Sequence, residues 1–245
     1  MKPILFNTAM VNALLEGRKT VTRRIANINA EITCNDGTTN HEFVPDNFNP
    51  TLDNPTGFVC RKCGFGVAAP HSRVPCGTSL FQPRYWPGDI LYVRETWQKV
   101  RVRKPQRAVP ADFSEIQYFY RADGEIANSD DTPFLWRPSI HMPKEAARIF
   151  LKVKSVRVER LQSITIEEAL KEGCTGLPCD CANRDEHGCV DCFNTGWIEP
   201  PQLDFMELWN STIKPADLPT CGWEANPWCW VIEFERCEKP KEVGT

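Results

Sequence analysis

Twelve cysteines in a chain of 245 residues constrain this fold more than any other feature of the sequence. The stretch CDCANRDEHGCVDC holds four of them as two close pairs, namely Cys179, Cys181, Cys189 and Cys192. Two such pairs across a short loop match a closed, tetrahedral Zn site, which folds a loop and does not catalyse. Cys174 and His187 are the alternative ligands. We therefore expect a structural zinc ion in a Cys-rich insert over residues 174–196.

A second cysteine-rich insert spans residues 33–78. From about Ala30 to Ser79 the chain is rich in Asn, Gly, Pro and Thr, without a helical or strand period. So long a stretch is uncommon inside a compact domain unless something holds it together. The pair in CRKC therefore predicts another zinc site, so that one or two ions are expected. Its expected ligands are Cys34, Cys60, Cys63 and Cys76, with His41 or His71 as alternatives.

The overall composition limits the class of protein. A formal net charge of -3 argues against indiscriminate binding of nucleic acid, so any affinity for phosphate must come from a local basic patch. The longest apolar runs are too short to span a bilayer, and the N-terminus lacks the apolar core of a signal peptide. We therefore expect a cytoplasmic protein without membrane contact, where reducing conditions favour metal binding over disulfides.

One local basic patch is EGRKTVTRRI, residues 16–25, with four cations and two threonines among ten residues. It follows an expected helix, NTAMVNALLEG, with Thr8 as the cap and Gly17 at the end. The patch then alternates like a strand, which would put Lys19 and Thr22 on opposite faces. This basic patch has three interpretations, namely a solvated rim of the fold, a phosphate-binding site or a reactive site.

The order of the expected elements is helix, strand, insert, several strands, helix, insert, helix, strand. A hairpin is expected around Asp123-Gly124, a bulge in ARIFLKVKSVRVERL near Ser155, and a helix in SITIEEALKEG with Ser163 as the cap. Because strands do not alternate regularly with helices, the order predicts an α+β fold. The expected architecture is a mostly antiparallel β-barrel with flanking helices, formed by a single domain over residues 1–245.

Several segments together resemble the ASCH-domain proteins, in particular the larger ones encoded by phages and prophages. They are MKPILFNTAMVNALLEGRKTVTRRI, RYWPGDILYVRETW, WRPSIHMPKEAARIFLKVKSVRVERLQSITIEEALKEG and NPWCWVIEFERC. The resemblance implies a PUA-like barrel that binds a nucleoside or RNA in a cleft lined by the GRKT segment. For a phage protein, a host protein is a further candidate partner. The oligomeric state is not indicated.

One branch of this family is an amidohydrolase that removes the acyl group from N4-acetylcytidine. Its catalytic Lys and Thr lie in a G-R-K-T-x-T segment and its Glu on a later helix, which by resemblance implies Lys19, Thr22 and Glu172 here. Glu168 is the alternative to Glu172, and Thr20 the alternative to Thr22. Thr22 could attack the amide if a neutral Lys19 took its proton, which requires burial or neighbouring cations to lower the pKa of Lys19.

Seven residues are candidates for substrate binding, namely Arg18, Thr20, Arg23, Arg24, Arg94, Trp136 and Ser139. Trp136 and Ser139 lie in a proline-rich loop that could stack a base and bond its edge. Arg94 precedes Glu95, which could pair with a cation. A second basic run, RVRKPQR at residues 101–107, could follow a nucleic-acid backbone. The alternatives to an amidohydrolase are a non-catalytic RNA-binding module and a phage ribonuclease that uses the same cations.

Overall fold

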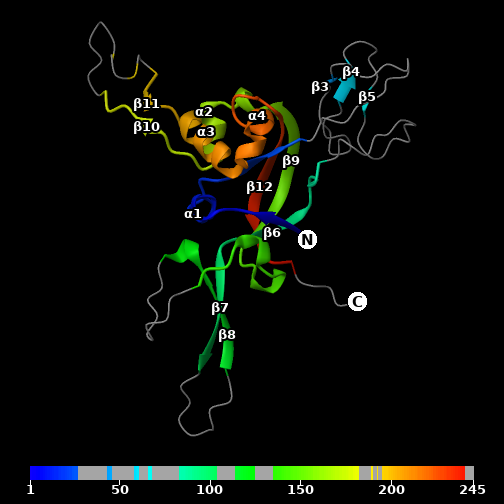
Figure 1. The fold of residues 1–245 in the computed structure, drawn as a ribbon, viewed down its shortest axis with the longest axis vertical. Coiled ribbons are helices and arrows are strands. Elements are labelled where there is room, and N and C mark those ends of the chain that lie inside the picture. The colour runs from blue at the N-terminus through cyan, green and yellow to red at the C-terminus, as the bar shows by residue number, and fades with distance from the viewer. Residues whose placement is uncertain are drawn as a thin grey trace. The chain divides into compact units, whose positions relative to one another are not determined.

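The structure is a computed structural model, and it describes only part of the chain (Figure 1). The described residues are 1–26, 43–45, 58–60, 66–67, 83–103, 114–124, 135–181, 189, 192 and 195–240. The chain divides into two compact units. The first unit comprises Met1–Gly17, Asp89–Lys152 and Arg236–Thr245, and the second comprises Arg18–Gly88 and Val153–Glu235. The single domain expected from the sequence stays a prediction.

The described strands include a five-stranded, mostly antiparallel sheet in the order β1-β6-β9-β12-β2. The bounds are β1 Lys2–Leu5, β2 Val21–Ile25, β6 Ile90–Arg94, β9 Phe150–Arg160 and β12 Trp228–Cys237. The β1–β6 pair is parallel, whereas the β6–β9 and β12–β2 pairs are antiparallel. The α+β class is therefore confirmed, but the strand order is open in the part of the chain described, so the expected barrel is not closed there.

In the first unit, helix α1 (Thr8–Leu15) buries Met10, Val11 and Leu14. Its N-cap is Asn7, whose side chain accepts a hydrogen bond from the Met10 amide at 2.8 Å, so the predicted cap at Thr8 is wrong by one residue. An amide oxygen at this position satisfies one of the backbone donors that the first helical turn leaves unpaired.

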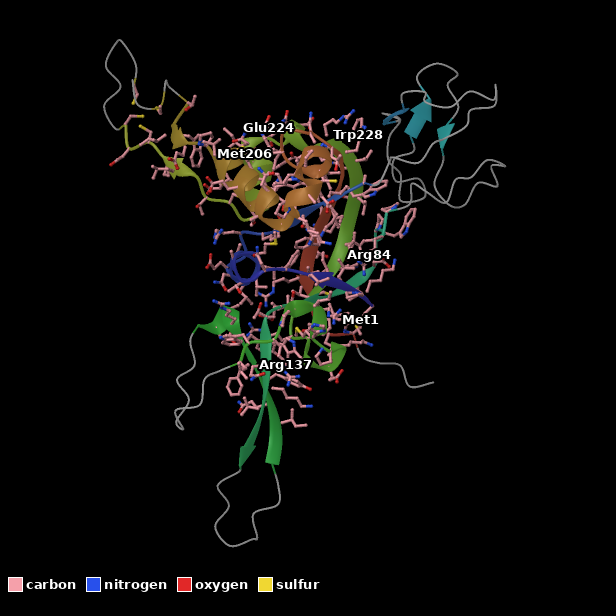
Figure 2. The ribbon with its side chains drawn as sticks, viewed as in Figure 1. Met1, Arg84, Arg137, Met206, Glu224 and Trp228 are labelled. Atoms are coloured by element: carbon pink, nitrogen blue, oxygen red, sulfur yellow. The ribbon has the colours of Figure 1, made fainter. Side chains whose placement is uncertain are left out.

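The first unit also contains a two-stranded ribbon of β7 (Trp97–Arg103) and β8 (Ser114–Tyr120). Trp97 packs with Met142 and Phe150. An isolated bridge joins Trp97 to Arg137, which Figure 2 labels at the base of this ribbon. Strand β8 pairs with the preceding strand β7, and Asp123 ends a 3-10 turn, η2 (Arg121–Asp123). The hairpin predicted around Asp123-Gly124 has its second arm outside the described residues. Two further 3-10 turns follow, η3 (Ser139–His141) and η4 (Lys144–Ala146).

In the second unit, helices pack against the sheet through a cluster that contains Leu161, Ala169, Phe205, Trp209 and Cys229. The helices are α2 (Ile166–Lys171), α3 (Pro201–Thr212) and α4 (Leu218–Cys221), with 3-10 turns η5 (Leu161–Ser163) and η6 (Pro215–Asp217). The remaining strands are β3 (Phe43–Pro45), β4 (Phe58–Cys60), β5 (Gly66–Val67), β10 (Leu177–Pro178) and β11 (Trp197–Glu199). Among the helices in the described ranges, none is long and apolar enough to cross a membrane.

Strand β9 shows the slip in burial that the sequence predicts near Ser155. Leu151 and Val153 are buried before it, and Val156 and Val158 after it. Odd-numbered residues therefore face the core in the first half of the strand, and even-numbered residues in the second half. As a result Arg157 and Glu159 leave the core face and become available to a polar cluster.

Helix α2 begins with a capping box. The Thr165 hydroxyl accepts a hydrogen bond from the Glu168 amide at 3.2 Å, and the Glu168 carboxylate accepts one from the Thr165 amide at 3.2 Å. The predicted cap at Ser163 is therefore wrong, because Ser163 belongs to the preceding 3-10 turn. Both residue types can cap, and only the point where the chain enters the helix decides between them.

Replacing Thr165 by Ala should lower the free energy of unfolding by about 1 kcal/mol, since one amide of the first turn of α2 loses its acceptor. The matched variant Ser163→Ala should change it by less than about 0.5 kcal/mol, because its side chain is exposed. Urea denaturation measures both. Equal losses in the two variants would contradict the assignment of the cap.

Candidate functional site

The segment Arg18–Thr20 covers the C-terminal end of helix α2. Its three successive residues donate hydrogen bonds to the three successive carbonyls at which the helix ends. The bonds run from the Arg18 guanidinium to the Gly173 carbonyl, from Lys19 Nζ to the Glu172 carbonyl at 2.8 Å, and from the Thr20 amide to the Lys171 carbonyl at 2.8 Å. Carbonyls at a helix end lack partners within the helix and carry partial negative charge, so two cations are favourable there.

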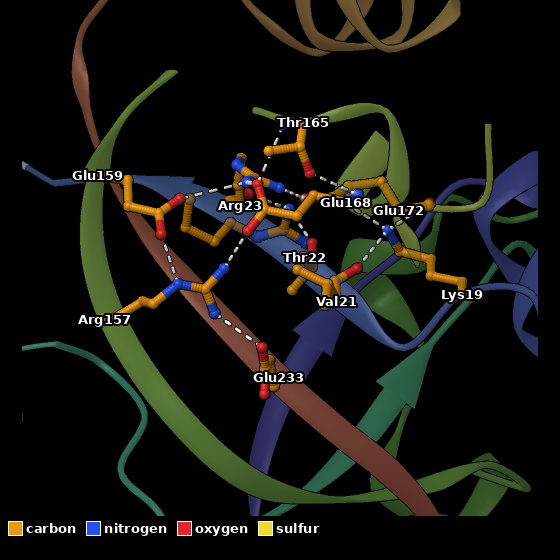
Figure 3. A network of polar contacts seen from close by, with 11 residues as sticks. Lys19, Val21, Thr22, Arg23, Arg157, Glu159, Thr165, Glu168, Glu172 and Glu233 are labelled. Carbon is orange, nitrogen blue, oxygen red and sulfur yellow. Dashed lines mark hydrogen bonds and ion pairs between the residues drawn. The ribbon is translucent and has the colours of Figure 1, made fainter. Parts of the chain in front are cut away.

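Lys19 is buried, with a side chain that has no exposed area, and Figure 3 shows it beside Glu172. Its Nζ lies 2.6 Å from Glu172 Oε2 and donates a further hydrogen bond to the Val21 carbonyl at 2.9 Å. With the Glu172 carbonyl, this supplies an acceptor for each of the three ammonium protons. Strand β2 begins only at Val21, so Lys19 lies in the preceding turn. The alternation of a regular strand therefore does not separate Lys19 from Thr22.

Burial lowers the pKa of Lys19 from its ordinary value, and the nearby Arg24 guanidinium lowers it further. The Glu172 carboxylate opposes both effects by its charge and its hydrogen bond, but the net direction is downward. Burial also lowers the pKa of Arg24, with Glu172 opposing it. The Lys19 amine therefore loses its proton more readily than an exposed lysine, which is the property expected of a lysine that acts as a base.

Thr22 is fully buried on β2, opposite Ile232 of β12. Its Oγ1 accepts a hydrogen bond from Arg24 Nη1 at 3.1 Å, and the same nitrogen donates to the Arg23 carbonyl at 3.0 Å. Thr20, the alternative to Thr22, is exposed and takes part through its backbone. The structure thus brings a buried hydroxyl and a guanidinium together on the strand that follows Lys19.

Arg23 connects both candidate carboxylates of α2. Its Nη1 lies 3.3 Å from Glu172 Oε1, and its Nη2 lies 2.7 Å from Glu168 Oε2 and 3.4 Å from Glu159 Oε2. Its side chain has no exposed area, and its guanidinium lies 5.7 Å from the centre of the Phe205 ring. Glu172 contacts Lys19 directly, whereas Glu168 reaches the cluster through Arg23. Glu172 is therefore the better partner for Lys19.

Arg157 extends the cluster to β12. It donates to Glu159 Oε1 at 2.5 Å, to Glu233 Oε1 at 2.8 Å and to the Glu168 carboxylate. The remaining oxygen of Glu233 accepts a hydrogen bond from Ser155 Oγ at 2.9 Å. Sequence reasoning missed Arg157, Glu159 and Glu233 as members of the site. The slip at Ser155 was the available signal, because it moves the charged residues of β9 to one face.

Two buried thiols lie beside this cluster. Burial, with the Glu172 charge, raises the pKa of Cys174 to about 12, and burial likewise raises that of Cys229 to about 12. Such thiols stay protonated at neutral pH and are poor nucleophiles and poor metal ligands. Cys174, an alternative ligand in the sequence analysis, packs in the hydrophobic cluster instead.

The four cysteines of the second insert come together at the ribbon of β10 and β11. Their Sγ atoms all lie within 4.8 Å of one another, at 3.6 Å for Cys179–Cys189 and 3.7 Å for Cys181–Cys192. A tetrahedral ion with sulfur ligands at about 2.3 Å requires sulfur–sulfur distances of about 3.8 Å. All four are free thiols, so the group could bind a metal ion.

Two backbone hydrogen bonds support this group. The Cys179 amide donates to the Gly196 carbonyl at 2.9 Å, and the Thr195 amide donates to the Cys192 carbonyl at 2.9 Å. Burial raises the pKa of Cys192, but the hydrogen bond from the Gly196 backbone and the neighbouring thiols lower it to about 7. Of the other predicted ligands, Cys34, Cys63, Cys76 and the side chain of Cys60 lie outside the described residues, as do His41, His71 and His187.

Arg94, Trp136 and Ser139 belong to the first unit, whereas Lys19 belongs to the second. Arg94 donates to the Met142 carbonyl at 2.8 Å and to the Ile140 carbonyl, which holds the turn η3 that begins at Ser139. Trp136 is half-buried. The contacts of Arg94 are therefore those of a residue that positions a loop.

Glu95 pairs with a cation, as the sequence analysis considered. It is buried and accepts two hydrogen bonds from Arg148, each at 2.9 Å. Arg148 also pairs with Asp123 at 2.7 Å and lies 3.9 Å from the centre of the Tyr120 ring. This second ion cluster joins η2 to the base of the ribbon within the first unit.

Comparison with known proteins finds no matching family model, no matching curated protein and no matching solved structure. The chain is a mixed α+β protein with a buried ion cluster centred on Lys19 and Glu172, and with a four-cysteine group that could hold a metal ion.

Acid should weaken the ion cluster through Glu168. Burial raises its pKa, but Arg23, Arg157 and the Thr165 amide lower it more, so its pKa in the folded protein is below the ordinary 4.5. The stabilisation is then fully present above pH 4.5 and is lost as the pH falls through the folded pKa. Glu168→Gln should therefore be less stable than the wild type at pH 7, with a difference that shrinks below pH 4.5 in urea denaturation.

The matched control for that measurement is Glu167→Gln. Glu167 is the exposed neighbour on the same turn, and it should show little difference from the wild type at either pH. A difference for Glu168→Gln that stays constant from pH 7 to pH 3 would contradict the ion pair with Arg23.

Cys181→Ser should lower the metal content of the purified protein by one equivalent, because a three-sulfur site binds the ion much more weakly. Plasma mass spectrometry measures the content. Cys221→Ser is the control, since Cys221 is a half-buried thiol outside the four-cysteine group and its loss should leave the metal content unchanged. Unchanged metal content in both variants would exclude the four cysteines as a metal site.

Proposed function

We propose that this chain is a nucleoside- or RNA-binding protein of the PUA-like ASCH type that hydrolyses the acyl group of an N4-acylated cytidine. One observation carries the proposal, namely the buried Lys19 amine at 2.6 Å from Glu172 and next to the strand that bears Thr22. Glu172 is the residue that the family resemblance implies for the catalytic carboxylate. Lys19 and Glu172 are 153 positions apart in the sequence, and their contact supports that alignment.

The pair can move a proton over a short distance. A proton shifted from Lys19 Nζ to Glu172 Oε2 leaves a neutral amine and a neutral carboxylic acid. Burial favours the neutral form of the Lys19 amine, in agreement with its lowered pKa. Lys19 thereby becomes a base without any exchange of protons with water.

In the proposed reaction, Thr22 Oγ1 forms a bond to the acyl carbon while its proton passes to Lys19. The carbon–nitrogen bond then breaks, and the cytidine amine leaves with a proton supplied by Glu172. Water hydrolyses the resulting threonine ester, releases the carboxylic acid and restores the hydroxyl. Arg24 Nη1, at 3.1 Å from Thr22 Oγ1, is a donor for the oxyanion that develops on the acyl oxygen.

A non-catalytic RNA-binding module is the second candidate, and the hydrogen bonds of Lys19 favour it. All three ammonium protons have protein acceptors, and the GRKT segment caps α2. A residue held in this way serves well as a clamp between β2 and α2 without any reaction. A ribonuclease is the third candidate, and it would cleave RNA that carries no acyl group.

We also propose that the metal of the four-cysteine group is zinc. Four thiolates at tetrahedral spacing are typical of structural Zn²⁺, which adds folding free energy and leaves no open position for catalysis. The residues that would hold it are Cys179, Cys181, Cys189 and Cys192. A zinc site of four thiolates requires reduced cysteines, and the cytoplasm keeps cysteines reduced, so the proposed location is cytoplasmic.

Thr22→Val should lower the rate of cytidine release from N4-acetylcytidine by about a thousandfold or more, because the nucleophile is lost while the volume of the buried side chain is kept. Thr22→Ser keeps a hydroxyl and should retain measurable activity. Chromatography of the products measures the rates. Thr96→Val, in the other compact unit, is the matched control and should have the wild-type rate.

Lys19→Met tests the base, but it removes the closer of the two cations that pair with buried Glu172 and so threatens the fold. The double variant Lys19→Met/Glu172→Gln removes both charges, and its fold can be checked by thermal unfolding. A folded double variant that still releases cytidine at the wild-type rate would disprove the proposed reaction. Wild-type protein that binds RNA without turnover would favour the second candidate, and cleavage of unacylated RNA the third.

A further inference from the structure

Arg160 and Trp228 form a stacked pair in the second unit, where β9 ends and β12 begins. The Arg160 guanidinium lies 4.3 Å from the centre of the Trp228 ring. Arg160, the last residue of β9, is exposed, and Trp228, the first residue of β12, is half-buried. Figure 2 labels Trp228. The pair therefore presents a planar cation to solvent, with an aromatic ring behind it.

A turn with a strained residue holds Arg160 in place. Asn226 has a φ of 44°, in the left-handed region that few residues other than glycine adopt. Its carbonyl accepts a hydrogen bond from Arg160 Nη1 at 3.1 Å, and its side-chain oxygen accepts one from the Gln162 amide at 2.9 Å. Gln162 Nε2 donates in turn to the Trp223 carbonyl at 2.9 Å. These bonds order the guanidinium before any ligand arrives, which lowers the entropy cost of binding.

The charge of Arg160 is not neutralised within the described part of the chain. Arg157, three residues earlier on β9, pairs with three carboxylates. In the described ranges no carboxylate pairs with Arg160, whose contacts are the Trp228 ring and the Asn226 carbonyl. An exposed guanidinium on an aromatic ring is suited to a ligand that is planar and belongs to an anionic molecule.

The stacked pair lies on the sheet face that carries Thr22. Directly opposite residues of antiparallel strands share a face, as do residues two apart on one strand. Thr22 lies opposite Ile232, and Arg24 lies opposite Trp230. Trp228 comes two residues before Trp230, so it belongs to the same face as Thr22. The distance along β12 from Ile232 to Trp228 is about 13 Å.

We propose that the stack of Arg160 on Trp228 binds the base of an RNA nucleotide that flanks the acylated cytidine. The inference rests on the proposed function for its ligand, and it makes a cytidine within a single strand of RNA the substrate. The acylated base lies at Thr22, and the sugar–phosphate backbone spans the distance of about 13 Å along the sheet. The flanking base then stacks on the outer side of the guanidinium plane.

The geometry of the pair favours a base over other ligands. Bases stack on guanidinium planes, and the Trp228 ring keeps the plane of Arg160 in one orientation. A carboxylate of an acidic protein would bond the edge of the guanidinium and leave its face uncovered. The bases of a duplex are stacked on each other, so a single strand is the form of RNA that can place a base here.

The first measurement uses the wild-type protein and the fluorescence anisotropy of labelled single-stranded RNA of about seven nucleotides, with an unacylated cytidine at the centre. One probe carries all its bases, and two others lack the base on the 5′ or the 3′ side of the cytidine. One of the two abasic probes should bind about tenfold more weakly than the complete probe, because it has lost the stacked base. Equal affinity for all three probes would overturn the inference.

The second measurement assigns that base to Arg160. Arg160→Lys keeps the charge but removes the plane, so it should bind the complete probe about tenfold more weakly than the wild type. It should bind the weak abasic probe as the wild type does, since the contact is already absent. Arg121→Lys is the matched control, because Arg121 is an exposed arginine of the other unit, and it should keep every wild-type affinity.

Two outcomes with these variants contradict the stack. Wild-type affinity of Arg160→Lys for the complete probe would show that the plane is not used, and equal losses in both lysine variants would show a general effect. Trp228→Leu should reproduce the selective loss of Arg160→Lys, because the guanidinium loses the ring that orients it. The abasic probes need no variant, so the inference stays falsifiable if a variant does not fold.

Deacylation separates this inference from the proposed function. The ratio of kcat/KM for an acylated RNA probe to that for free N4-acetylcytidine should fall about tenfold in Arg160→Lys and stay constant in Arg121→Lys. RNA binding that depends on Arg160 and the flanking base, in a protein without deacylase activity, would support the stacking site and refute the proposed reaction. Deacylation with RNA binding that is indifferent to the flanking base would support the reaction and overturn this inference.

Discussion

The second unit depends on the burial of an ammonium group and a carboxylate against each other. Removal of Lys19 and Glu172 from water costs several kcal/mol for each ion, and attraction at 2.6 Å offsets that cost only because the remaining polar atoms also have partners. Lys19 reaches two carbonyls, and the second oxygen of Glu172 faces Arg23. Glu172 follows the last turn of α2, and Lys19 precedes β2. This pair therefore joins the end of the helix to the start of the strand.

The rest of the ion cluster follows from that arrangement. Arg23 and Arg157 each contact Glu168, and through it they tie β2, β9 and α2 together, with Glu233 adding β12. Buried ion clusters are weak evidence for stability, but the loss of one member is expensive because it leaves a charge unpaired. A lowered pKa at Lys19 and a hydroxyl bonded to Arg24 are features that a stabilising clamp does not require. The proposed reaction depends on these two features.

Much of the local structure could be predicted from the sequence. Periodicity placed α3 and β12, the phase of apolar residues located the slip in β9, and the cysteine spacing identified the four-thiol group. Predictions failed where two residues of similar chemistry compete, as with Thr8 against Asn7 and Ser163 against Thr165. The pairing of β8 with β7 joins two strands that lie on either side of residues 104–113. Pairing depends on contacts between distant segments, which no local pattern contains.

The sequence by itself determined the residue types and the spacings on which each site depends, including the lysine and threonine of GRKTVT and the two pairs of cysteines. It also determined the periodicity of the main elements, because helical and strand periods follow from backbone geometry. Only the tertiary structure decided that Glu172 contacts Lys19 directly, that Arg157 and Glu233 join the cluster, and that Arg94 holds a loop in the other unit. The physical reason is that burial and charge pairing act between residues up to 153 positions apart, and packing of the whole chain sets those distances.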